Sequence, residues 1–470
     1  MSSTAPAAPT APTPAEARSE LARRELRRRG ARSSLEAFCG QMDDGYRQTP
    51  TTKIICRHLD ALANGDIRTL AIFMPPGAGK TYHAGERFPA YMLGRRPSSA
   101  IMSVSYAERK AQDSSWKVRE LIRDRERWPW PDIDVPVESS ALGKWRTTKG
   151  GEFQVAGIGA GIGGFHPHGL IIDDPIGDPD DALSASFRDR QWRWYTEMAA
   201  RRLPTWGWQL LMMTRWHESD LAARILEAYT NWTVLSLPLY AEPDDQLGRA
   251  PGEVLPGYDG SQIPDLEAGQ MSSRAFAAQY QQRPTPETGN LFSRAWFEHR
   301  GDPPSVWKPG WLIQVLDAAW KTGVANDYSV IATWGFDGVY YYVVDVWRDK
   351  VEFPDLRRIA AEAYEWYRPS AMLVEDAAAG TAIIQEFRRG SNIPVLAVPA
   401  LGSKESRAEA ITPIFESGRV VLPRSAPWLD AWIEEHVSFP HGKNDDQVDT
   451  TTMALARLSQ TITRPFAVRQ

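Results

Sequence analysis

The segment FMPPGAGKT, residues 73–81, limits the fold of this 470-residue chain more than any other part of its sequence. It continues the apolar run TLAIFM, residues 69–74, and it opens a stretch with helical character. Glycine tolerates positive φ, so Gly77 and Gly79, on either side of Ala78, can turn backbone N–H groups toward a phosphate. A strand, a glycine-rich turn and a helix in this order predict a P-loop at the carboxyl end of the strand.

Two side chains at the end of this segment suit a nucleotide. Lys80 can reach the β- and γ-phosphates of ATP, and the Thr81 hydroxyl can hold Mg²⁺. The strict pattern has glycine where this sequence has Met74, and a glycine-rich turn before a helix is the alternative interpretation. We favour nucleotide binding because the strand, the Gly-Lys-Thr run and the helix are all present.

A second apolar run, GLIIDDP at residues 169–175, ends in two acids. A buried strand of this kind delivers its carboxylates to the carboxyl edge of an open α/β sheet, where ligands bind. Asp173 is therefore expected to bind Mg²⁺, and Asp174 is expected to orient the attacking water. Paired aspartates after a strand are also common turn residues, so this assignment depends on the P-loop.

A third strand, within residues 208–214, ends in Thr214 and is followed by Arg215. Thr214 is expected to sense the γ-phosphate at the same sheet edge. Arg215 is left with two interpretations, because its guanidinium can face phosphate or pair with an acid.

The pattern from about residue 68 to residue 236 alternates short apolar runs with longer amphipathic ones, which predicts an α/β fold with a mostly parallel sheet. The predicted strands are residues 69–74, 99–105, 152–157, 169–174, 208–214 and 232–238. Residues 241–290 then become rich in proline, glycine, aspartate and glutamine, as at a domain boundary. We therefore expect an ATPase domain over residues 34–240 and a linker over 241–290.

A second block, residues 291–462, is predicted to be a mixed α/β domain followed by a tail at 463–470. Its order is three strands, a helix, then strand, helix, strand and helix. The strands are expected at residues 311–320, 328–336, 339–347, 371–377 and 393–400, and the helices at 353–367, 381–390 and 444–460.

This second block carries separated acids at the ends of its elements. Asp317 and Glu375 each end an apolar strand, and Asp446 and Asp449 share one face of the last helix. Asp327 stands at the start of the second predicted strand of this block, which can run back beside the first and bring Asp327 close to Asp317. Hard divalent cations prefer oxygen ligands, and two-metal phosphodiester cleavage needs three or four convergent carboxylates. The set predicts a nuclease site for two Mg²⁺ or Mn²⁺ ions, in the arrangement of an RNase H-like domain.

Composition excludes several classes of protein. No apolar run reaches the roughly 20 residues that span a membrane, and the first residues lack a secretory signal core, so we expect neither a membrane protein nor a secreted one. Two cysteines cannot make a disulfide scaffold or a four-cysteine zinc site. A net charge of −5 gives no general argument for nucleic-acid binding.

The first 33 residues are expected to be a disordered tail, residues 1–14, and an arginine-rich helix, residues 15–32. This helix can be an arm that touches DNA or a solvated surface helix, and we favour the second interpretation because its glutamates can pair with some of the arginines.

Taken together, these motifs resemble the large terminase subunit of tailed bacteriophages, prophages and gene-transfer agents. The resemblance covers most of residues 35–460. It rests on MPPGAGKT, on GIGAGIGGF before LIIDDP, on the TRW run, on FAAQYQQRPTPETGNLF, on LDAAWKTGVANDYS and on NDDQVD.

The resemblance implies an ATP-driven motor that pumps double-stranded DNA into a prohead, fused to an RNase H-like endonuclease that cuts concatemeric DNA. It implies the portal protein and a small terminase subunit as partners. It also implies a homo-oligomeric ring during packaging, expected to be a pentamer, whereas the protein can be monomeric in solution. The place of action is then the host cytoplasm, and transiently the portal vertex.

The resemblance also assigns roles to single residues. It places Thr214 at the coupling position, and it implies Asp317, Glu375 and either Asp446 or Asp449 as nuclease acids, with Asp449 favoured. It implies that Lys404 and Arg407 touch DNA phosphate.

One departure from the family pattern concerns the P-loop. Many relatives carry an arginine just before its Gly-Lys pair, whereas this sequence has Pro-Pro-Gly-Ala at residues 75–78. An arginine finger is then expected from elsewhere, such as a neighbouring subunit.

A different function remains open from the sequence alone. The chain can be a nucleic-acid-dependent, helicase-like ATPase whose C-terminal domain binds DNA without cutting it. Retention of all the acids in the second block favours the motor with a nuclease.

Overall fold

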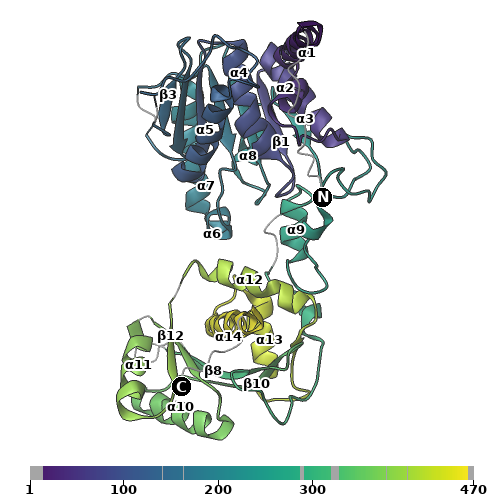
Figure 1. Cartoon of the computed structure of the whole chain (residues 1–470). Helices are drawn as coiled ribbons and strands as arrows, with labels where there is room; N and C mark the ends of the chain where they lie inside the picture. The colour runs from purple at the N-terminus through teal and green to yellow at the C-terminus, as the bar shows by residue number, and fades with distance from the viewer. Residues whose placement is uncertain are drawn as a thin grey trace, which may run out of the picture. The chain divides into compact units, whose positions relative to one another are not determined.

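The computed structural model of the protein describes residues 14–139, 141–161, 164–285, 290–318, 328–376, 378–399 and 401–463. The chain forms two compact units. The first contains residues up to 262 together with 275–285, and the second contains residues 263–274 together with those from 286 onward. Figure 1 shows the helices and strands of both units.

The first unit is built on a seven-stranded sheet with the order β3-β4-β2-β5-β6-β1-β7. All neighbouring strands are parallel except β3 and β4, which are antiparallel. The strands are β1 Thr69–Phe73, β2 Ala100–Ser105, β3 Lys144–Arg146, β4 Glu152–Gly157, β5 Gly169–Asp173, β6 Trp208–Met213 and β7 Thr233–Ser236. Every residue of β1 and β5 is buried, which explains their continuous apolar runs and confirms the predicted parallel α/β fold.

Helices cover the sheet of the first unit. Side chains of η2 and α8 pack on alternate residues of the central strands, and α3, η1 and α5 also contact these strands. The helices are α1 Pro14–Ser33, α2 Leu35–Met42, α3 Pro50–Asn64, η1 Thr81–Arg87, α4 Phe88–Arg95, α5 Glu108–Arg123, α6 Pro179–Leu183, α7 Ala185–Arg193, η2 Trp194–Ala199, η3 Ala200–Arg202, α8 Leu221–Ala228 and η4 Gly260–Gln262. The predicted arginine-rich helix is present as α1, whereas residues 1–13 of the predicted tail lie outside the described residues.

The second unit has a six-stranded mixed sheet with the order β12-β11-β8-β9-β10-β13. Strands β8, β9 and β10 are antiparallel neighbours, and β11 and β12 continue parallel to β8. The strands are β8 Leu312–Asp317, β9 Ser329–Phe336, β10 Tyr341–Asp349, β11 Met372–Glu375, β12 Val395–Val398 and β13 Val420–Val421. This arrangement agrees with the predicted mixed layout.

Two helical layers enclose this second sheet, with α12, α13 and α14 on one face and α10 and α11 on the other (Figure 1). Strand β9 shows the alternation, because Ala332 and Trp334 pack toward the first layer and Ile331 toward the second. The helices are η5 Arg294–Phe297, α10 Phe353–Tyr367, α11 Ala378–Gly390, α12 Lys404–Glu416, α13 Leu429–Ser438 and α14 Asp446–Thr463. Helices α12 and α13 and strand β13 were not predicted from the sequence.

The segment expected to be a linker is divided between the two units. Residues 241–262 and 275–285 belong to the first unit, and residues 263–274 belong to the second. Helix α9, Ser273–Gln279, crosses this division. Ser273 donates its backbone N–H to Glu416 at 2.9 Å, within the second unit. The exact domain boundaries therefore stay a prediction.

In the described part of the chain, no helix has both the length and the apolar character that crossing a membrane requires.

Candidate functional site

Three neighbouring strands of the first unit bring the predicted nucleotide-binding residues to one sheet edge. Strand β6 lies between β1 and β5, with Phe73 opposite Met213 and Met212 opposite Asp173. The loop after β1, Thr214 after β6 and the acids at the end of β5 therefore meet at the carboxyl edge of the sheet. Residues of the loop, Ala78 among them, line a pocket of about 430 Å³ together with Thr214 and Asp174.

The loop after β1 has the backbone form expected of a phosphate cradle. Gly77 and Gly79 have φ values of 75° and 86°, in the left-handed region that favours glycine. A Cβ atom at Gly77 would lie 2.3 Å from the Oε1 atom of Gln262. The backbone conformation therefore favours glycine at this position, whereas the exposed end of the Gln262 side chain can move aside.

Lys80 is buried beneath the loop, with a relative exposure of 5%. Its Nζ atom donates to the carbonyl oxygens of Met74 and Pro75, at 2.7 and 2.9 Å, and to Oγ1 of Thr214 at 2.9 Å. Burial lowers the pKa of Lys80, while Asp174 and Asp173 oppose this effect. The structure thus joins Lys80 to Thr214 and holds a cation under the loop that would face phosphate.

Thr81, the first residue of η1, contacts Asp173, the last residue of β5. The Thr81 hydroxyl donates to the Asp173 carboxylate, with both oxygens at 3.2 Å. Burial and the neighbouring charge of Asp174 raise the pKa of Asp173 to about 6. A hydroxyl and a buried carboxylate suit a hard divalent cation such as Mg²⁺, so the predicted ligand pair fits that ion.

Asp174 is held in an unusual backbone conformation, with φ of 42°. Its Oδ1 accepts from the backbone N–H of Thr214 at 3.0 Å, and its Oδ2 lies 3.2 Å from Nζ of Lys110. Burial opposes ionisation of Lys110, but Asp174 and Asp173 raise its pKa above the ordinary value. The local contacts therefore aim the Asp174 carboxylate at the pocket.

Lys110 also lines the pocket, although it was not predicted from the sequence. It lies in the first turn of α5, directly after β2, which neighbours β5 in the sheet. A lysine shortly after a predicted strand of the same parallel sheet was the available signal.

Arg215 pairs with an acid and does not face the pocket, which is the second of the two interpretations left open by the sequence. Its Nε donates to Oδ2 of Asp220 at 2.8 Å, and Asp220 is completely buried. Among the described residues, no arginine lines the pocket, and its lysines are Lys80 and Lys110.

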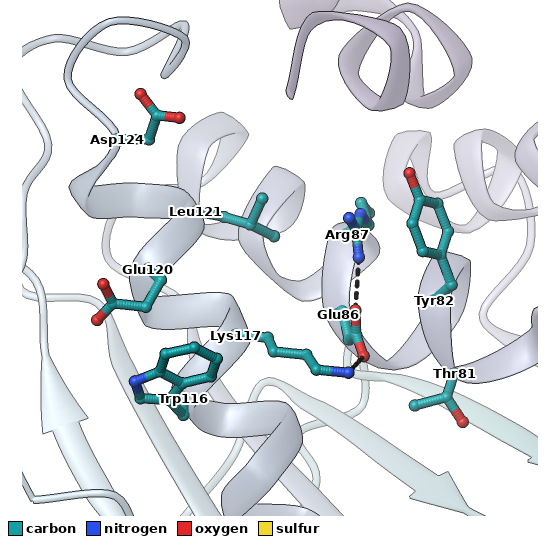
Figure 2. Close-up of a pocket in the computed structure, with 9 residues that line it drawn as sticks. All are labelled: Thr81, Tyr82, Glu86, Arg87, Trp116, Lys117, Glu120, Leu121 and Asp124. Carbon is teal, nitrogen blue, oxygen red and sulfur yellow. Dashed lines mark hydrogen bonds and ion pairs between the residues drawn. The ribbon is translucent and has the colours of Figure 1, made fainter. Parts of the chain in front are cut away.

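A second pocket, of about 660 Å³, lies between η1 and α5. Figure 2 shows the carboxylate of Glu86 between Arg87 and Lys117, whose Nζ lies 2.7 Å from Oε1 of Glu86. Thr81 and Tyr82 line both pockets. Helix η1 therefore borders both pockets. Its buried Glu86 forms ion pairs with two cationic side chains, those of Arg87 and Lys117.

The second unit brings its acids together in the same way. Strands β8 and β11 are parallel neighbours with Leu316 opposite Val374, so Asp317 and Glu375, one residue further on, end at the same edge. Asp446 and Asp449 belong to the first turn of α14, which packs against β8 and β9. The predicted strand, strand and helix arrangement is present, whereas Asp327 lies outside the described residues.

Electrostatics identify Asp317 as the centre of this acidic cluster. Burial, followed by the charges of Asp449, Asp446 and Glu375, raises the pKa of Asp317 to about 8. Burial and Glu435 raise the pKa of Asp446 to about 6. Carboxylates that raise the pKa of one another form a site that a bound cation would stabilise, so the donor set fits Mg²⁺ or Mn²⁺.

Basic side chains of α12 contact these acids. Nζ of Lys404 lies 2.7 Å from Asp449 and 2.8 Å from Asp445. Nη2 of Arg407 lies 2.9 Å from Asp449 and 3.6 Å from Glu375. The two residues expected at DNA phosphate are therefore paired with carboxylates in this structure.

Asp446 has different partners from Asp449. It lies 3.5 Å from Nη2 of Arg348, which also contacts Glu435 at 3.1 Å. The pairing of Asp449 with the same arginine as Glu375 favours Asp449 as the third acid, and that choice stays a prediction.

Comparison with known proteins gives a family match for the second unit. Residues 315–458 match the family model of the terminase RNaseH-like domain. No curated protein matches the sequence.

Several solved structures are similar to the chain. The large terminase from a thermophilic bacteriophage, in its second crystal form, is 12% identical, covers 87% of this chain and 98% of its own, and gives a TM-score of 0.52. The large terminase of bacteriophage HK97 is 14% identical, with coverages of 87% and 95% and a TM-score of 0.34. The large terminase nuclease from the thermophilic phage G20c with bound magnesium is 17% identical, with coverages of 36% and 98% and a TM-score of 0.28. The first of these matches shows a shared fold over both units.

Proposed function

We propose that this chain, which carries a terminase RNaseH-like domain and whose resemblance to large terminase subunits is confirmed, is an ATP-driven DNA-packaging motor and endonuclease. One observation carries the proposal: a P-loop pocket in one unit and a cluster of carboxylates in an RNase H-like unit occur in the same chain. The motor would move double-stranded DNA into a prohead through the portal, and the nuclease would cut concatemeric DNA.

The first pocket has a residue for each need of ATP hydrolysis. Lys80 can turn from the carbonyls of Met74 and Pro75 toward phosphate, and Thr81 with Asp173 would hold Mg²⁺. The ion supplies charge neutralisation on the phosphates. Asp174 would orient the attacking water, since Lys110 and the backbone of Thr214 fix its carboxylate.

Thr214 is placed to connect the nucleotide to movement. It bonds Lys80 through its side chain and Asp174 through its backbone. A change at either residue on hydrolysis would therefore reach strand β6. The assignment of Thr214 as the coupling residue is part of the proposal.

In the second unit, Asp317, Glu375 and Asp449 would hold the Mg²⁺ or Mn²⁺ ions of the nuclease, with Asp446 and Asp327 as further candidates. Two such ions supply Lewis acidity to the phosphodiester and to the attacking water. The match of residues 315–458 to the terminase RNaseH-like domain supports this assignment. When metal ions bind these carboxylates, Arg407 and Lys404 would be released from their ion pairs and could contact DNA phosphate.

The remaining parts of the proposal concern partners. From the terminase assignment we expect three partners: a portal protein, a small terminase subunit and further copies of this chain in a ring, expected to be a pentamer. The protein would act in the host cytoplasm and at the portal vertex. The pocket, whose described lining holds no arginine, supports a finger supplied by a neighbouring subunit in the ring.

Two separation-of-function variants test the proposal. Lys80→Ala should abolish ATP hydrolysis, because the lysine charge acts on the transferring phosphoryl and losing such a contact costs about 10²–10³ in rate. Asp449→Asn should abolish Mn²⁺-dependent plasmid digestion and retain ATPase activity. Lys53→Ala on α3 and Asp355→Asn on α10 are matched controls with exposed side chains.

Each outcome separates the candidate functions. Both activities in the wild-type protein, each lost in one variant, support the motor with a nuclease. ATPase activity without cleavage under any divalent ion would instead favour the helicase-like alternative. Near wild-type hydrolysis by Lys80→Ala protein would refute the P-loop assignment.

A further inference from the structure

Two cysteines and a histidine meet in the interior of the first unit. Cys39 lies in α2, Cys56 in α3 and His83 in η1, so three helices each supply one side chain. One ligand atom from each residue lies within 4.8 Å of the other two. The residues are 0%, 2% and 4% exposed. Two cysteines are too few for a four-cysteine site, but with a histidine they make a different donor set.

The imidazole of His83 is oriented as in metal sites. Its Nδ1 lies 3.0 Å from the carbonyl oxygen of Gly79, so this nitrogen carries the proton and donates it. Its Nε2 is buried and has no hydrogen-bond partner among the described residues. Burial lowers the pKa of His83 to about 4, which leaves the ring neutral near pH 7. A metal-binding histidine typically donates one N–H to a carbonyl and offers the other nitrogen to the ion.

The two thiols are close to each other and have weak partners. A hydrogen bond between Cys39 and Cys56, together with burial, raises the pKa of Cys39 well above its ordinary value. The Tyr46 hydroxyl lies 3.7 Å from Sγ of Cys56. Arg87 acts in the opposite direction on Cys39 and favours its thiolate. A thiophilic cation would replace these contacts with stronger ones.

We propose that Cys39, Cys56 and His83 bind one Zn²⁺ ion, as two thiolates and a neutral imidazole, beside the P-loop. Zn²⁺ takes sulfur at about 2.3 Å and imidazole nitrogen at about 2.0–2.1 Å in tetrahedral geometry, which the three side chains reach by small movements. The two thiolates balance the charge of the ion, so the buried site is neutral, and two thiol protons pass to solvent on binding. Tyr46 is placed to fill the fourth position or to hold a water there.

The position of this cluster gives the ion a role distinct from nuclease chemistry. His83 belongs to the helix that begins at Thr81, and its other nitrogen bonds Gly79 of the P-loop. A bound ion would tie that helix to α2 and α3. The site would therefore fix the nucleotide loop on the N-terminal helices.

Cobalt substitution of the full-length chain tests the proposal directly. The protein would be purified under reducing conditions, stripped of metal with a chelator and titrated with Co²⁺. Cys39 and Cys56 are the only cysteines in the sequence, so a thiolate-to-cobalt charge-transfer band can arise only here, whatever the acids of the second unit bind. We expect this band to rise to a plateau as Co²⁺ is added and to disappear when Zn²⁺ is added in excess of the cobalt.

Variants locate the ion. Cys56→Ser should lose the band, and His83→Gln should weaken cobalt and zinc binding. His58→Gln is the matched control, because Nδ1 of His58 bonds the carbonyl oxygen of Ile54, as Nδ1 of His83 bonds that of Gly79, but His58 lies outside the cluster. Retention of the band in the control supports the site.

Three results would overturn the proposal. The first is the absence of a thiolate band in wild-type protein with reduced cysteines, which needs no variant to fold. The second is equal zinc content in wild-type and Cys56→Ser protein. The third concerns metal-free, reduced protein that is mixed with Zn²⁺ in the presence of air: formation of a Cys39–Cys56 disulfide without bound zinc would overturn the proposal.

Discussion

Asp317 has the strongest need for a cation among the candidate nuclease residues. Its pKa rises to about 8 through burial and through Asp449, Asp446 and Glu375, and Lys404 offsets only part of this. Its ionised form is therefore less stable in the folded chain than in the unfolded one. This cost is absent below the ordinary aspartate pKa near 4, grows as the pH rises, and is complete above about pH 8.

Asp317→Asn should therefore stabilise the metal-free protein in a pH-dependent way. In EDTA, the melting temperature of the variant should exceed that of wild type most at pH 8 and little at pH 4.5, measured by differential scanning calorimetry. Saturating Mn²⁺ should reverse the order at pH 8, because only wild type gains the ion. An equal melting temperature at pH 8 in EDTA would contradict the raised pKa of Asp317.

Single residues show where sequence reasoning succeeds and where it stops. Lys80, Thr81, Asp173 and Asp174 were predictable because each ends or follows an apolar strand of a parallel sheet, whose edge is shared. Lys110 was missed because a lysine in a charged helix has no distinctive spacing. The cluster around His83 was also hidden, since its members come from three separate elements.

Helix α12 shows why some elements escaped prediction. Pro413 stands inside it, and proline ordinarily disfavours a helix interior. Burial of Ile411 and Phe415 in the core of the second unit overrides that local preference. The strands and helices with clear periodicity, such as α10, were predicted well.

The basic side chains of α12 predict a competition between metal and arginine. Arg407 pairs with Asp449 and Glu375, so Arg407→Met should lower the Mn²⁺ concentration needed for half-maximal cleavage. It should also weaken duplex binding and reduce the salt slope by about 1, as expected for one lost phosphate contact. Cleavage would be followed across a Mn²⁺ titration, and binding in EDTA by fluorescence anisotropy.

Arg358→Met is the control for this comparison, since Arg358 pairs with Glu362 on the exposed face of α10. It should change neither quantity. An unchanged Mn²⁺ requirement together with an unchanged salt slope would show that Arg407 serves only the fold.

At the scale of the whole molecule, the segment 263–274 belongs with the nuclease unit although the sequence placed it in a linker. Ser273 donates to Glu416, and Arg419 donates to the carbonyl of Ala268 at 3.2 Å. The composition of this stretch indicates a boundary, but its contacts depend on residues more than 140 positions away. Sequence composition cannot show such pairings.

Residues 291–470 are expected to fold alone and to cleave duplex DNA with Mn²⁺. A fragment of residues 263–470 should be more stable by about 1–2 kcal/mol, because it keeps a few net hydrogen bonds. Urea unfolding of both fragments measures the difference, and Ser273→Ala in the longer one should remove part of it. Equal stabilities would contradict the assignment of 263–274, and a folded fragment without cleavage under any divalent ion would contradict the nuclease.

ATP hydrolysis should depend on assembly. Lys80 and Lys110 are the basic residues that line the nucleotide pocket in the described chain, and Arg215 is tied to buried Asp220. An arginine supplied in trans is worth about 10³–10⁵ in rate in other NTPases, so dilute monomers should be slow. Turnover per subunit, measured across a dilution series with and without portal-bound proheads and DNA, should rise as subunits gather, with Lys80→Ala as the background. A flat, high turnover in the dilute monomer would mean that the finger acts in cis, and loss of that turnover in Arg215→Met protein would identify it.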